Sequence, residues 1–556
     1  MGDTFATTPN QATEPTRLQQ PVILIRGFGG LGVEDEKRIA YQGFNDGTVY
    51  PQKRGENYIY EGLILRFMKS RWTYRDATNI VGYYSQPLAN APPLPARLKD
   101  FDPSFFSGSK IVIDPAMALS LLDSPDPLRS LWVFRYYDLD DRNFPVYGEA
   151  LVRIIKFIRK LTQRKEGGTP KVNIIAHSMG GLIVREAVQN TFPTAGEDAR
   201  EFINKIVTLG TPHQGISFQL LKNWIPIAAE NELEHFNPEK QASPKNRTAY
   251  VNFAKFFPPE RLLTVVGTNY RTYGPVVASW LNRIASLGGE FGANYNRSDG
   301  LVKQTFAQIP GAPRTFVHKC HGGPDSLVTS REAFEAATRF LFGNIRVRLH
   351  LVEAEVTRGF DLFGKSEFFF GVSIKPRGVD FDLFHQSAEA ENSYGPFSDP
   401  HFMDPKPAFG WAGPDRLIWE GWLDTTARTV GTDNPGAGQG QDGNGAAQNQ
   451  PPDIVMRLDF YVGERDLFGV GFSDNVVFRK QYYVRAVFTD LEDLSTFQRF
   501  ELHTGERFDA PDSGARSGED GWEFGIGGTG FKARLRLRFA VVPETGAPKP
   551  AVFPER

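Results

Sequence analysis

Three residues with the chemistry of a hydrolytic site stand far apart in the chain: Ser178, Asp299 and His321. A serine hydroxyl becomes an effective nucleophile when a base removes its proton, and a carboxylate must orient that base. Ser178 follows the apolar run Val172–Ala176 and precedes a helical pattern. This strand–turn–helix context predicts a tight turn that exposes the hydroxyl at the carboxyl end of a sheet. An ordinary surface turn is the alternative interpretation.

The base is sought among the 9 histidines of the chain. Seven are set aside because of the elements predicted around them: His177, His213, His235, His350, His385, His401 and His503. His177 lies in the turn itself, so its side chain is expected to point away from the Ser178 hydroxyl. His318 falls inside a predicted strand, Phe316–Cys320, whereas His321 begins a glycine-rich turn that suits a mobile imidazole. His321 is therefore the predicted base and His318 the alternative.

The predicted acid, Asp299, lies in the turn-forming sequence Asn296-Arg297-Ser298-Asp299-Gly300. It stands between Ser178 and His321, which gives the chain order serine, acid, histidine of the nucleophile-elbow enzymes. The alternative is a plain Asp-Gly turn.

Two backbone N–H groups are candidates for an oxyanion hole. Met179 follows the serine at the predicted start of a helix, where N–H groups have no partner within the helix. Phe28 lies in a glycine-rich loop after the predicted strand Pro21–Ile25. An ordinary strand-to-helix turn is one alternative for this loop. A phosphate loop is disfavoured, because no Gly-Lys-Ser/Thr follows.

The chain of 556 residues exceeds the usual size of one hydrophobic core, so at least two domains are expected. Residues 1–20 are polar and are expected to be disordered. Residues 21–343 alternate strand and helix patterns, which predicts a mostly parallel α/β sheet flanked by helices. Within them, residues 31–130 lack regular periodicity and are expected to hold an insertion or cap.

An apolar cluster lies in the segment 216–260: Trp224, Ile225 and Ile227. One interpretation is a mobile lid whose apolar face contacts the acyl part of a substrate. The other is a surface helix packed on the core.

Residues 344–556 show the period-two alternation of half-buried strands, separated by turn-rich gaps. This pattern predicts an antiparallel β-sandwich domain. Separate strands are predicted at Val476–Phe478 and Tyr482–Phe488. The Gly/Asn/Gln-rich residues 430–452 are expected to form a flexible loop.

The composition excludes several classes of function. Lys+Arg 63 against Asp+Glu 65 leaves a net charge of -2, which disfavours nucleic acid as a partner. The single cysteine excludes an intramolecular disulfide and a thiolate metal cluster. No secretory signal or bilayer-length apolar run is visible, so a cytoplasmic location is the default, with export by another route left open. A peripheral contact with a lipid or polymer surface stays open, as does the oligomeric state.

Together these motifs resemble those of serine lipases and esterases of the α/β-hydrolase superfamily, and bacterial true lipases above all. Ala176-His177-Ser178-Met179-Gly180-Gly181 resembles their elbow, and Gly210-Thr211-Pro212-His213-Gln214-Gly215 is similar to the segment after their next strand. Ser298-Asp299-Gly300-Leu301-Val302 looks like their acid turn. One departure is Arg26-Gly27, where those lipases usually carry His-Gly.

The resemblance covers the α/β part and implies Ser178 as nucleophile, Asp299 as acid, His321 as base, and the Phe28 and Met179 N–H groups as the oxyanion hole. The implied reaction is hydrolysis of small-molecule or lipid esters through an acyl-enzyme, with apolar acyl or aromatic esters favoured. This chemistry requires no metal and no organic cofactor. Two alternatives are an acyltransferase that uses the same residues and a hydrolase-like scaffold whose function lies in the β domain.

Overall fold

The computed structural model describes residues 19–27, 60–77, 81–88, 93–136, 143–163, 169–214, 250–270, 297–323, 325–357, 366–387, 389–397, 401–402, 416–425, 453–466, 475–489, 497–504, 516–518, 521–543 and 549–550. Four of the segments singled out in the sequence lie outside these residues: 1–18, Phe28, 216–249 with its apolar cluster, and 430–452.

The first part of the chain forms a seven-stranded sheet with the order β2-β5-β1-β6-β7-β8-β9. Every pairing in it is parallel. The strands are β1 (Val22–Ile25), β2 (Arg75–Asp76), β5 (Ser130–Phe134), β6 (Val172–His177), β7 (Ile203–Leu209), β8 (Leu262–Gly267) and β9 (Arg314–Val317). The central strands β1, β5 and β6 are buried along their whole length, as strands covered on both faces must be. The parallel α/β sheet predicted from the sequence is confirmed.

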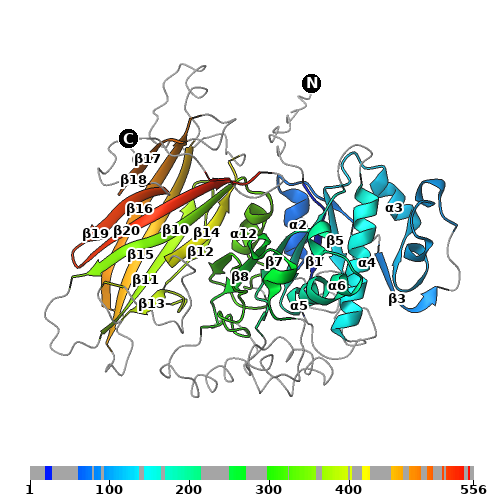
Figure 1. Cartoon of the computed structure of the whole chain (residues 1–556), viewed down its shortest axis with the longest axis horizontal. Helices are drawn as coiled ribbons and strands as arrows, with labels where there is room; N and C mark the ends of the chain where they lie inside the picture. The colour runs from blue at the N-terminus through cyan, green and yellow to red at the C-terminus, as the bar shows by residue number, and fades with distance from the viewer. Residues whose placement is uncertain are drawn as a thin grey trace, which may run out of the picture.

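Helices lie on both faces of this sheet (Figure 1). The main ones are α2 (Glu61–Lys69), α4 (Phe144–Thr162), α5 (Met179–Glu186) and α12 (Arg331–Phe342). Alternate residues of a strand point to opposite faces. Accordingly, Ile23 and Ile25 of β1 share a buried cluster with α4 and α5, whereas Val22 and Leu24 pack with α2 and α12. The sheet is thus the middle layer of three.

The order of the strands reverses around β1. The next strands of this sheet along the chain, β2 and then β5, lie on one side of β1, and β6 lies on the other. Loops that leave two neighbouring strands at such a reversal diverge, which opens a crevice at the carboxyl ends of the strands. The residues that follow β1 and β6, Arg26-Gly27 and Ser178, stand at this position.

The range 31–130 contains regular elements as well as residues outside the description. Besides α2 and β2 they are β3 (Val81–Leu88), β4 (Gly108–Ile113) and α3 (Pro115–Leu122). β2 extends the main sheet, whereas β3 and β4 pair only with each other among the described strands. Part of the range thus belongs to the sheet layers, and the extent of a cap stays a prediction.

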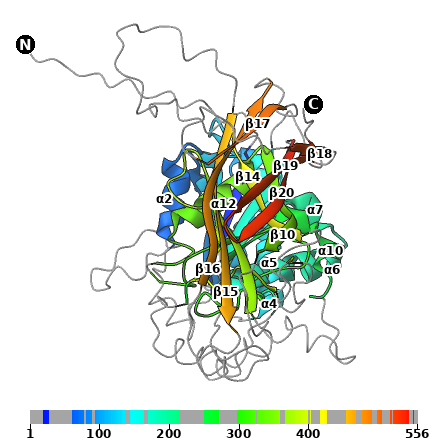
Figure 2. The same ribbon diagram turned by 90° about the vertical axis from the view of Figure 1, so that its left-hand side faces the viewer.

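The second part of the chain forms two antiparallel sheets, each six-stranded. The first contains β10 (Ile345–Val356), β14 (Leu417–Leu423), β18 (Arg516–Gly518), β19 (Gly521–Gly528), β20 (Phe531–Val541) and β21 (Lys549–Pro550). The second contains β11 (Ser366–Pro376), β12 (Phe384–His385), β13 (Tyr394–Phe397), β15 (Asp453–Asp466), β16 (Asn475–Phe488) and β17 (Phe497–His503). The long strands of the two sheets lie face to face (Figures 1 and 2).

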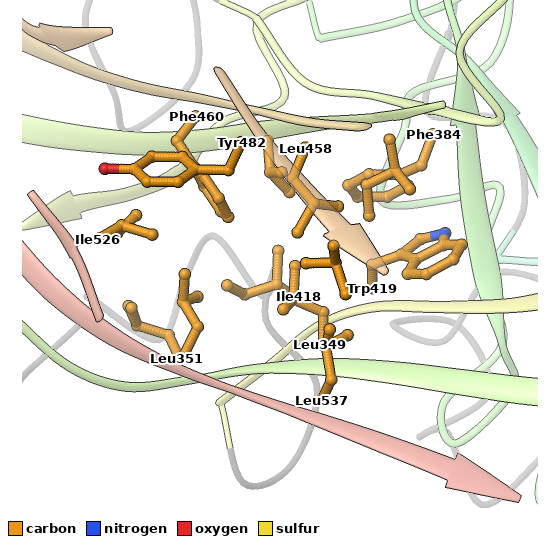
Figure 3. Close-up of a cluster of buried hydrophobic side chains, with 14 of the residues drawn as sticks. Leu349, Leu351, Phe384, Ile418, Trp419, Leu458, Phe460, Tyr482, Ile526 and Leu537 are labelled. Atoms are coloured by element: carbon orange, nitrogen blue, oxygen red, sulfur yellow. The ribbon is translucent and has the colours of Figure 1, made fainter. Parts of the chain in front are cut away.

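A large apolar core fills the space between these sheets. Leu349 and Leu351 from one sheet meet Leu458 and Phe460 from the other (Figure 3). The chain is therefore an α/β-hydrolase fold followed by an antiparallel β-sandwich. The prediction of two separate strands within 476–488 is wrong: β16 runs unbroken through exposed polar residues, because its pairing with β15 continues there.

The sandwich packs against the edge of the parallel sheet at β9. The rings of Phe316 in β9 and Phe384 in β12 lie 5.5 Å apart between centroids. The Thr315 hydroxyl donates a hydrogen bond of 2.8 Å to the Leu383 carbonyl. Phe340 of α12 meets Trp422 of β14 edge to face, with centroids 4.6 Å apart. Among the described residues, no helix combines the length and the apolar character needed to cross a bilayer.

Candidate active site

Ser178 occupies a strained turn between β6 and α5. Its φ of 50° and ψ of -125° are rare for a residue with a side chain, and such strain persists only where the surroundings hold it. The Ser178 N–H donates to the Leu209 carbonyl at 2.9 Å. A Cβ atom at Gly180 would lie 2.6 Å from the Arg26 carbonyl oxygen, and one at Gly181 would lie 2.2 Å from the Thr211 hydroxyl. The small residues after the serine thus let α5 approach the neighbouring strands.

The structure brings Ser178, His321 and Asp299 into one hydrogen-bonded chain. His321 Nε2 lies 2.9 Å from Ser178 Oγ, and His321 Nδ1 lies 2.8 Å from Asp299 Oδ2. The serine is 9% exposed, the histidine 3% and the aspartate 1%. The three side chains come from the loops after β6, β9 and β8. This arrangement can move a proton from the hydroxyl to an oriented imidazole.

The two oxygens of the Asp299 carboxylate have separate tasks. Oδ1 accepts backbone N–H bonds from Leu301 at 3.0 Å and from Val302 at 2.7 Å. Oδ2 is left to face His321, whose own N–H donates to the Asp299 carbonyl at 2.8 Å. A buried carboxylate needs such partners to be tolerated. The acid turn therefore fixes both the carboxylate and the main chain of the histidine.

Two glycines, to which the sequence analysis assigned no role of their own, make room for this pair. Gly210 follows β7 with a φ of +55°, and a Cβ there would lie 2.9 Å from Asp299 Oδ2 and 3.1 Å from His321 Nδ1. Gly267 ends β8, where a Cβ would lie 2.6 Å from the Asp299 Cβ. Asp299 can therefore lie close to the ends of β7 and β8 only because glycine, which has no side chain, occupies these two positions.

Comparison with known proteins gives one family match and several distant structural likenesses. Residues 137–252 match a family described as the PGAP1-like alpha/beta domain. No curated protein matches the chain. Among solved structures, the lipase BlEst2 of Bacillus licheniformis is 14% identical over 60% of this chain and 94% of its own, with a TM-score of 0.29.

Two further structures show likeness of the same order. The metagenomic carboxyl esterase MGS0156 is 16% identical over 40% of this chain and 67% of its own, with a TM-score of 0.24. Phospholipase PlaB from Legionella pneumophila is 10% identical over 80% of this chain and 86% of its own, with a TM-score of 0.29. At these values the likenesses do not identify the reaction of this chain.

His177 and Tyr60 lie directly behind the candidate triad, and the sequence analysis assigned a role to neither. The Tyr60 hydroxyl is 2.5 Å from His177 Nδ1, and His177 Nε2 is 2.9 Å from the His321 carbonyl oxygen. The described hydrogen bonds of the His177 ring thus go to groups other than Ser178. Burial, and then the neighbouring His321, holds the pKa of His177 well below its ordinary value. No sequence pattern links Tyr60 to a histidine 117 residues away.

The alternative base, His318, lies outside the triad contacts. β9 ends at Val317, so the prediction that His318 lies within a strand is wrong: the chain turns there, with Lys319 N–H donating to the Val317 carbonyl at 2.8 Å. His318 Nδ1 lies 3.0 Å from the Thr268 hydroxyl, and its ring lies 5.9 Å from that of His385. His318 thus turns toward the sandwich.

The remaining predicted site residues fall in two groups. Met179 is the first residue of α5, so its N–H belongs to the turn that has no partner within the helix. Phe28, Trp224, Ile225 and Ile227 lie outside the described residues. Arg185 of α5 donates to the carbonyls of His213 and Tyr250, which flank the undescribed stretch 215–249.

Metal binding finds no support in the described part of the chain, where no group of His, Cys, Asp and Glu side chains is suited to hold an ion. The chemistry available at the site is that of the Ser178 hydroxyl, the His321 imidazole and the Asp299 carboxylate.

Proposed function

We propose that the protein is a carboxylic-ester hydrolase that works through a serine acyl-enzyme. The observation that carries this proposal is the chain Ser178 Oγ–His321–Asp299, with distances of 2.9 and 2.8 Å. The nucleophile contacts one ring nitrogen and the acid contacts the other, which is the connectivity that general-base catalysis requires. The strained turn at Ser178 and the start of α5 beside it add the geometry of a nucleophile elbow.

The reaction follows from these contacts. Ser178 Oγ attacks the ester carbonyl carbon while its proton passes to His321 Nε2, and Asp299 holds the resulting imidazolium in place. The Met179 N–H, with the Phe28 N–H as the second donor we propose, stabilises the oxyanion of the tetrahedral intermediate. His321 then protonates the leaving alcohol. A water molecule, deprotonated by the same imidazole, hydrolyses the acyl-enzyme and restores the serine.

The substrate class is proposed on the character of the sequence alone. The apolar cluster Trp224, Ile225 and Ile227 favours an ester with an apolar acyl or aromatic part. Residues 21–343 are the proposed catalytic domain, and residues 344–556 are the proposed separate β-sandwich domain.

A fluorophosphonate probe tests the proposal, because it forms an adduct only with an activated serine. The purified full chain is expected to carry one adduct on Ser178, identified by mass spectrometry of the peptide. Ser178→Ala is expected to abolish labelling and to lower ester hydrolysis by about 10⁴-fold or more. Ser387→Ala is the matched control, because Ser387 also contacts a histidine, at 3.2 Å from His385 Nε2.

Hydrolysis of p-nitrophenyl esters of increasing chain length then tests the substrate class. A higher kcat/KM for octanoyl than for acetyl esters is expected. A higher kcat/KM for acetyl esters would still support an ester hydrolase but would contradict the proposed preference for apolar acyl groups. An unlabelled Ser178 in folded protein would contradict the mechanism itself and favour the scaffold alternative.

A further inference from the structure

A second chain of hydrogen bonds runs beside the candidate triad and joins four segments. The Gly27 N–H after β1 donates to the Tyr60 hydroxyl oxygen at 2.9 Å. The Tyr60 oxygen lies 2.5 Å from His177 Nδ1 at the end of β6. His177 Nε2 lies 2.9 Å from the backbone carbonyl oxygen of His321, after β9. Gly27, Tyr60, His177 and His321 are all buried, so water does not compete for these bonds.

The chemistry of the partners fixes where each proton lies. A carbonyl oxygen only accepts, so His177 Nε2 must carry the proton that it shares with His321. A neutral imidazole has one N–H, so Nδ1 accepts, and the Tyr60 O–H must donate to it. The Tyr60 oxygen then accepts from Gly27. A single arrangement of protons satisfies all of these contacts.

Several groups keep His177 neutral in this arrangement. The ionisable groups that face it in the described structure are the Tyr60 phenol from the start of α2 and the His321 imidazole, with Asp299 behind the latter. The His177 and His321 rings lie 4.9 Å apart between centroids, so a proton on one ring disfavours a proton on the other. Burial adds to this effect and lowers the pKa of His177.

We propose that Tyr60 and His177 are positioning residues for the ester hydrolysis proposed above. They hold the main chain of His321 so that its ring stays between Ser178 and Asp299, and they couple that chain to Gly27 in the loop after β1. This role rests on the proposed function.

The position of His321 in the chain explains why such support is needed. It is followed by Gly322 and Gly323, the latter with a φ of +89°, and these residues have no side chains to restrain it. The backbone hydrogen bonds that close the turn are made by the preceding residue, Cys320, with Asp325 at 3.2 Å and Leu327 at 3.0 Å. The main chain of His321 is instead held from both sides: its N–H donates to the Asp299 carbonyl at 2.8 Å, and its carbonyl accepts from His177. A lost contact on either side lets the imidazole drift from the serine, and misplacement by about 1 Å can cost about 10²-fold in rate.

Gly27 gains a similar restraint. Its N–H is bound by Tyr60 and its carbonyl oxygen accepts from the Tyr136 hydroxyl at 2.8 Å. A Cβ at Gly27 would lie 2.8 Å from the Ser178 Cβ, so this residue packs directly on the nucleophile. The same tyrosine–histidine pair therefore orders two sides of the reaction centre.

Tyr60→Phe is the first test. It removes one hydroxyl and leaves the ring, and we expect kcat to fall about tenfold while KM changes by less than about twofold. Without the O–H donor the neutral form of His177 loses stabilisation, so its pKa rises and a second proton enters the site more easily. A charged His177 opposes the imidazolium that forms on His321 during the reaction, so activity falls as His177 takes up its proton. The acid limb of the kcat/KM profile is therefore expected to move to higher pH.

Tyr74→Phe is the matched control. Tyr74 is also buried beside α2, and its hydroxyl donates to the Gln20 carbonyl at 2.7 Å, at the end of β1 remote from the site. It is expected to lose stability to a similar degree, with kcat and the pH profile unchanged.

Two substitutions of His177 separate hydrogen bonding from packing. His177→Gln retains an N–H donor and a carbonyl acceptor in a side chain that does not titrate, whereas His177→Leu retains bulk alone. The leucine variant is expected to lose about 10²-fold in kcat, and the glutamine variant to recover at least tenfold of that loss. Glutamine in place of His177 is also expected to prevent the shift of the acid limb when combined with Tyr60→Phe.

The outcomes separate this role from the proposed function. An acid limb that stays in place in Tyr60→Phe, or equal effects of Tyr60→Phe and Tyr74→Phe, would overturn the positioning role, while labelling of Ser178 in the unsubstituted protein would still support the hydrolase. Equal activity of His177→Gln and His177→Leu would also overturn it. If the unsubstituted protein neither labels nor hydrolyses esters, the proposed function fails and this role fails with it.

Discussion

Two regions of the molecule each join a serine, a histidine and an aspartate, and their surroundings differ. In the α/β region His321 bridges Ser178 and Asp299 at 2.9 and 2.8 Å. In the sandwich, His385 Nε2 lies 3.2 Å from Ser387 Oγ and His385 Nδ1 lies 3.3 Å from Asp382 Oδ2. The connectivity through the imidazole is the same in both.

The partners of the sandwich cluster are divided among other groups. His385 Nδ1 also faces the Ser373 hydroxyl at 3.0 Å, which is nearer than the carboxylate. Ser387 Oγ accepts the Ala390 N–H at 3.1 Å, as a turn serine does. The His385 side chain is 31% exposed, against 4% for His321. Hydrogen bonds in this cluster therefore stabilise a turn at the sheet edge and leave no oriented base.

The difference comes from the sheets that carry the two clusters. Parallel strands end at one edge, so β6, β8 and β9 deliver Ser178, Asp299 and His321 to one point although the serine and histidine are 143 residues apart. Asp382, His385 and Ser387 are neighbours in sequence and meet through a local turn. Contact between a serine, a histidine and an aspartate is thus not enough to identify a catalytic cluster. The candidate catalytic cluster differs from the structural one because rigid strands, distant in sequence, hold its residues at one point.

The largest effect on activity is expected when the aspartate of each cluster is replaced by asparagine, one at a time. Asp299→Asn keeps the shape and lets the amide bind the wrong tautomer of His321, so kcat is expected to fall about 10⁴-fold. Asp382→Asn is expected to leave ester hydrolysis within about twofold. Steady-state kinetics on a p-nitrophenyl ester, with circular dichroism to check folding, measure both. Equal losses would break the distinction between the clusters.

The sequence predicts one of these clusters because its residues carry local signals. The run before Ser178 reads as a buried strand and the residues after it as a helix, and the structure has β6 and α5 there. The turn around Asp299 and the glycines after His321 are likewise visible in sequence. The mostly parallel sheet is predicted by the alternation of strand and helix patterns before residue 344, and the sandwich by the period-two alternation after it.

The contacts behind the site have no such signal. Tyr60 lies in a stretch without regular periodicity, and its link to His177 exists only once α2 packs on the sheet. Gly210 follows β7 and Gly267 is the last residue of β8, and the clash that a side chain would cause at either position appears only when Asp299 is placed. The two separate strands predicted within β16 are wrong for a different reason. Arg479, Lys480 and Gln481 interrupt the alternation of apolar and polar residues, but their pairing with β15 keeps the strand continuous.

Gly210→Ala tests whether the convergence tolerates one added methyl group. The new Cβ would lie 2.9 Å from Asp299 Oδ2, closer than real contacts allow, so we expect the acid–base pair to shift and kcat to fall about 10²-fold. Gly196→Ala is the matched control, because Gly196 also has a positive φ, +72°, but nothing lies within 4 Å of its Cβ position. Both variants are expected to lose about 1–2 kcal/mol of stability from the backbone strain.

Only Gly210→Ala is expected to lose activity as well. Thermal unfolding gives the stability change and fluorophosphonate labelling rates give the effect on the site. Unchanged labelling in Gly210→Ala would show that the loop after β7 can move away from the acid.

The smallest expected effect is on the pH dependence of stability, and it comes from histidines buried in the α/β region. Burial, and then the nearby Arg185, keeps the pKa of His213 well below its ordinary value, as burial and His321 do for His177. Above about pH 6.5 both histidines are neutral in the folded and unfolded chain, so their contribution to stability is fully present. As the pH falls below this value, the two histidines become protonated in the unfolded chain, whereas in the folded chain they stay neutral to lower pH. The free energy of unfolding then drops by up to about 1.4 kcal/mol per pH unit for each histidine.

His213→Gln is therefore expected to remove one histidine's share of this acid sensitivity, at most about 2 kcal/mol between pH 6.5 and 5. Urea unfolding at a series of pH values measures the slope. Thr162→Val is the matched control, because it removes a buried hydroxyl that donates to a backbone carbonyl, that of Ile158 at 2.7 Å, and not to a titrating ring, so it should lower stability by a similar amount at every pH. A slope that His213→Gln leaves unchanged would mean that the histidine is protonated in the folded chain. Burial of the loop after β7 would then not exclude charge, and burial alone would no longer distinguish the α/β region from the sandwich edge.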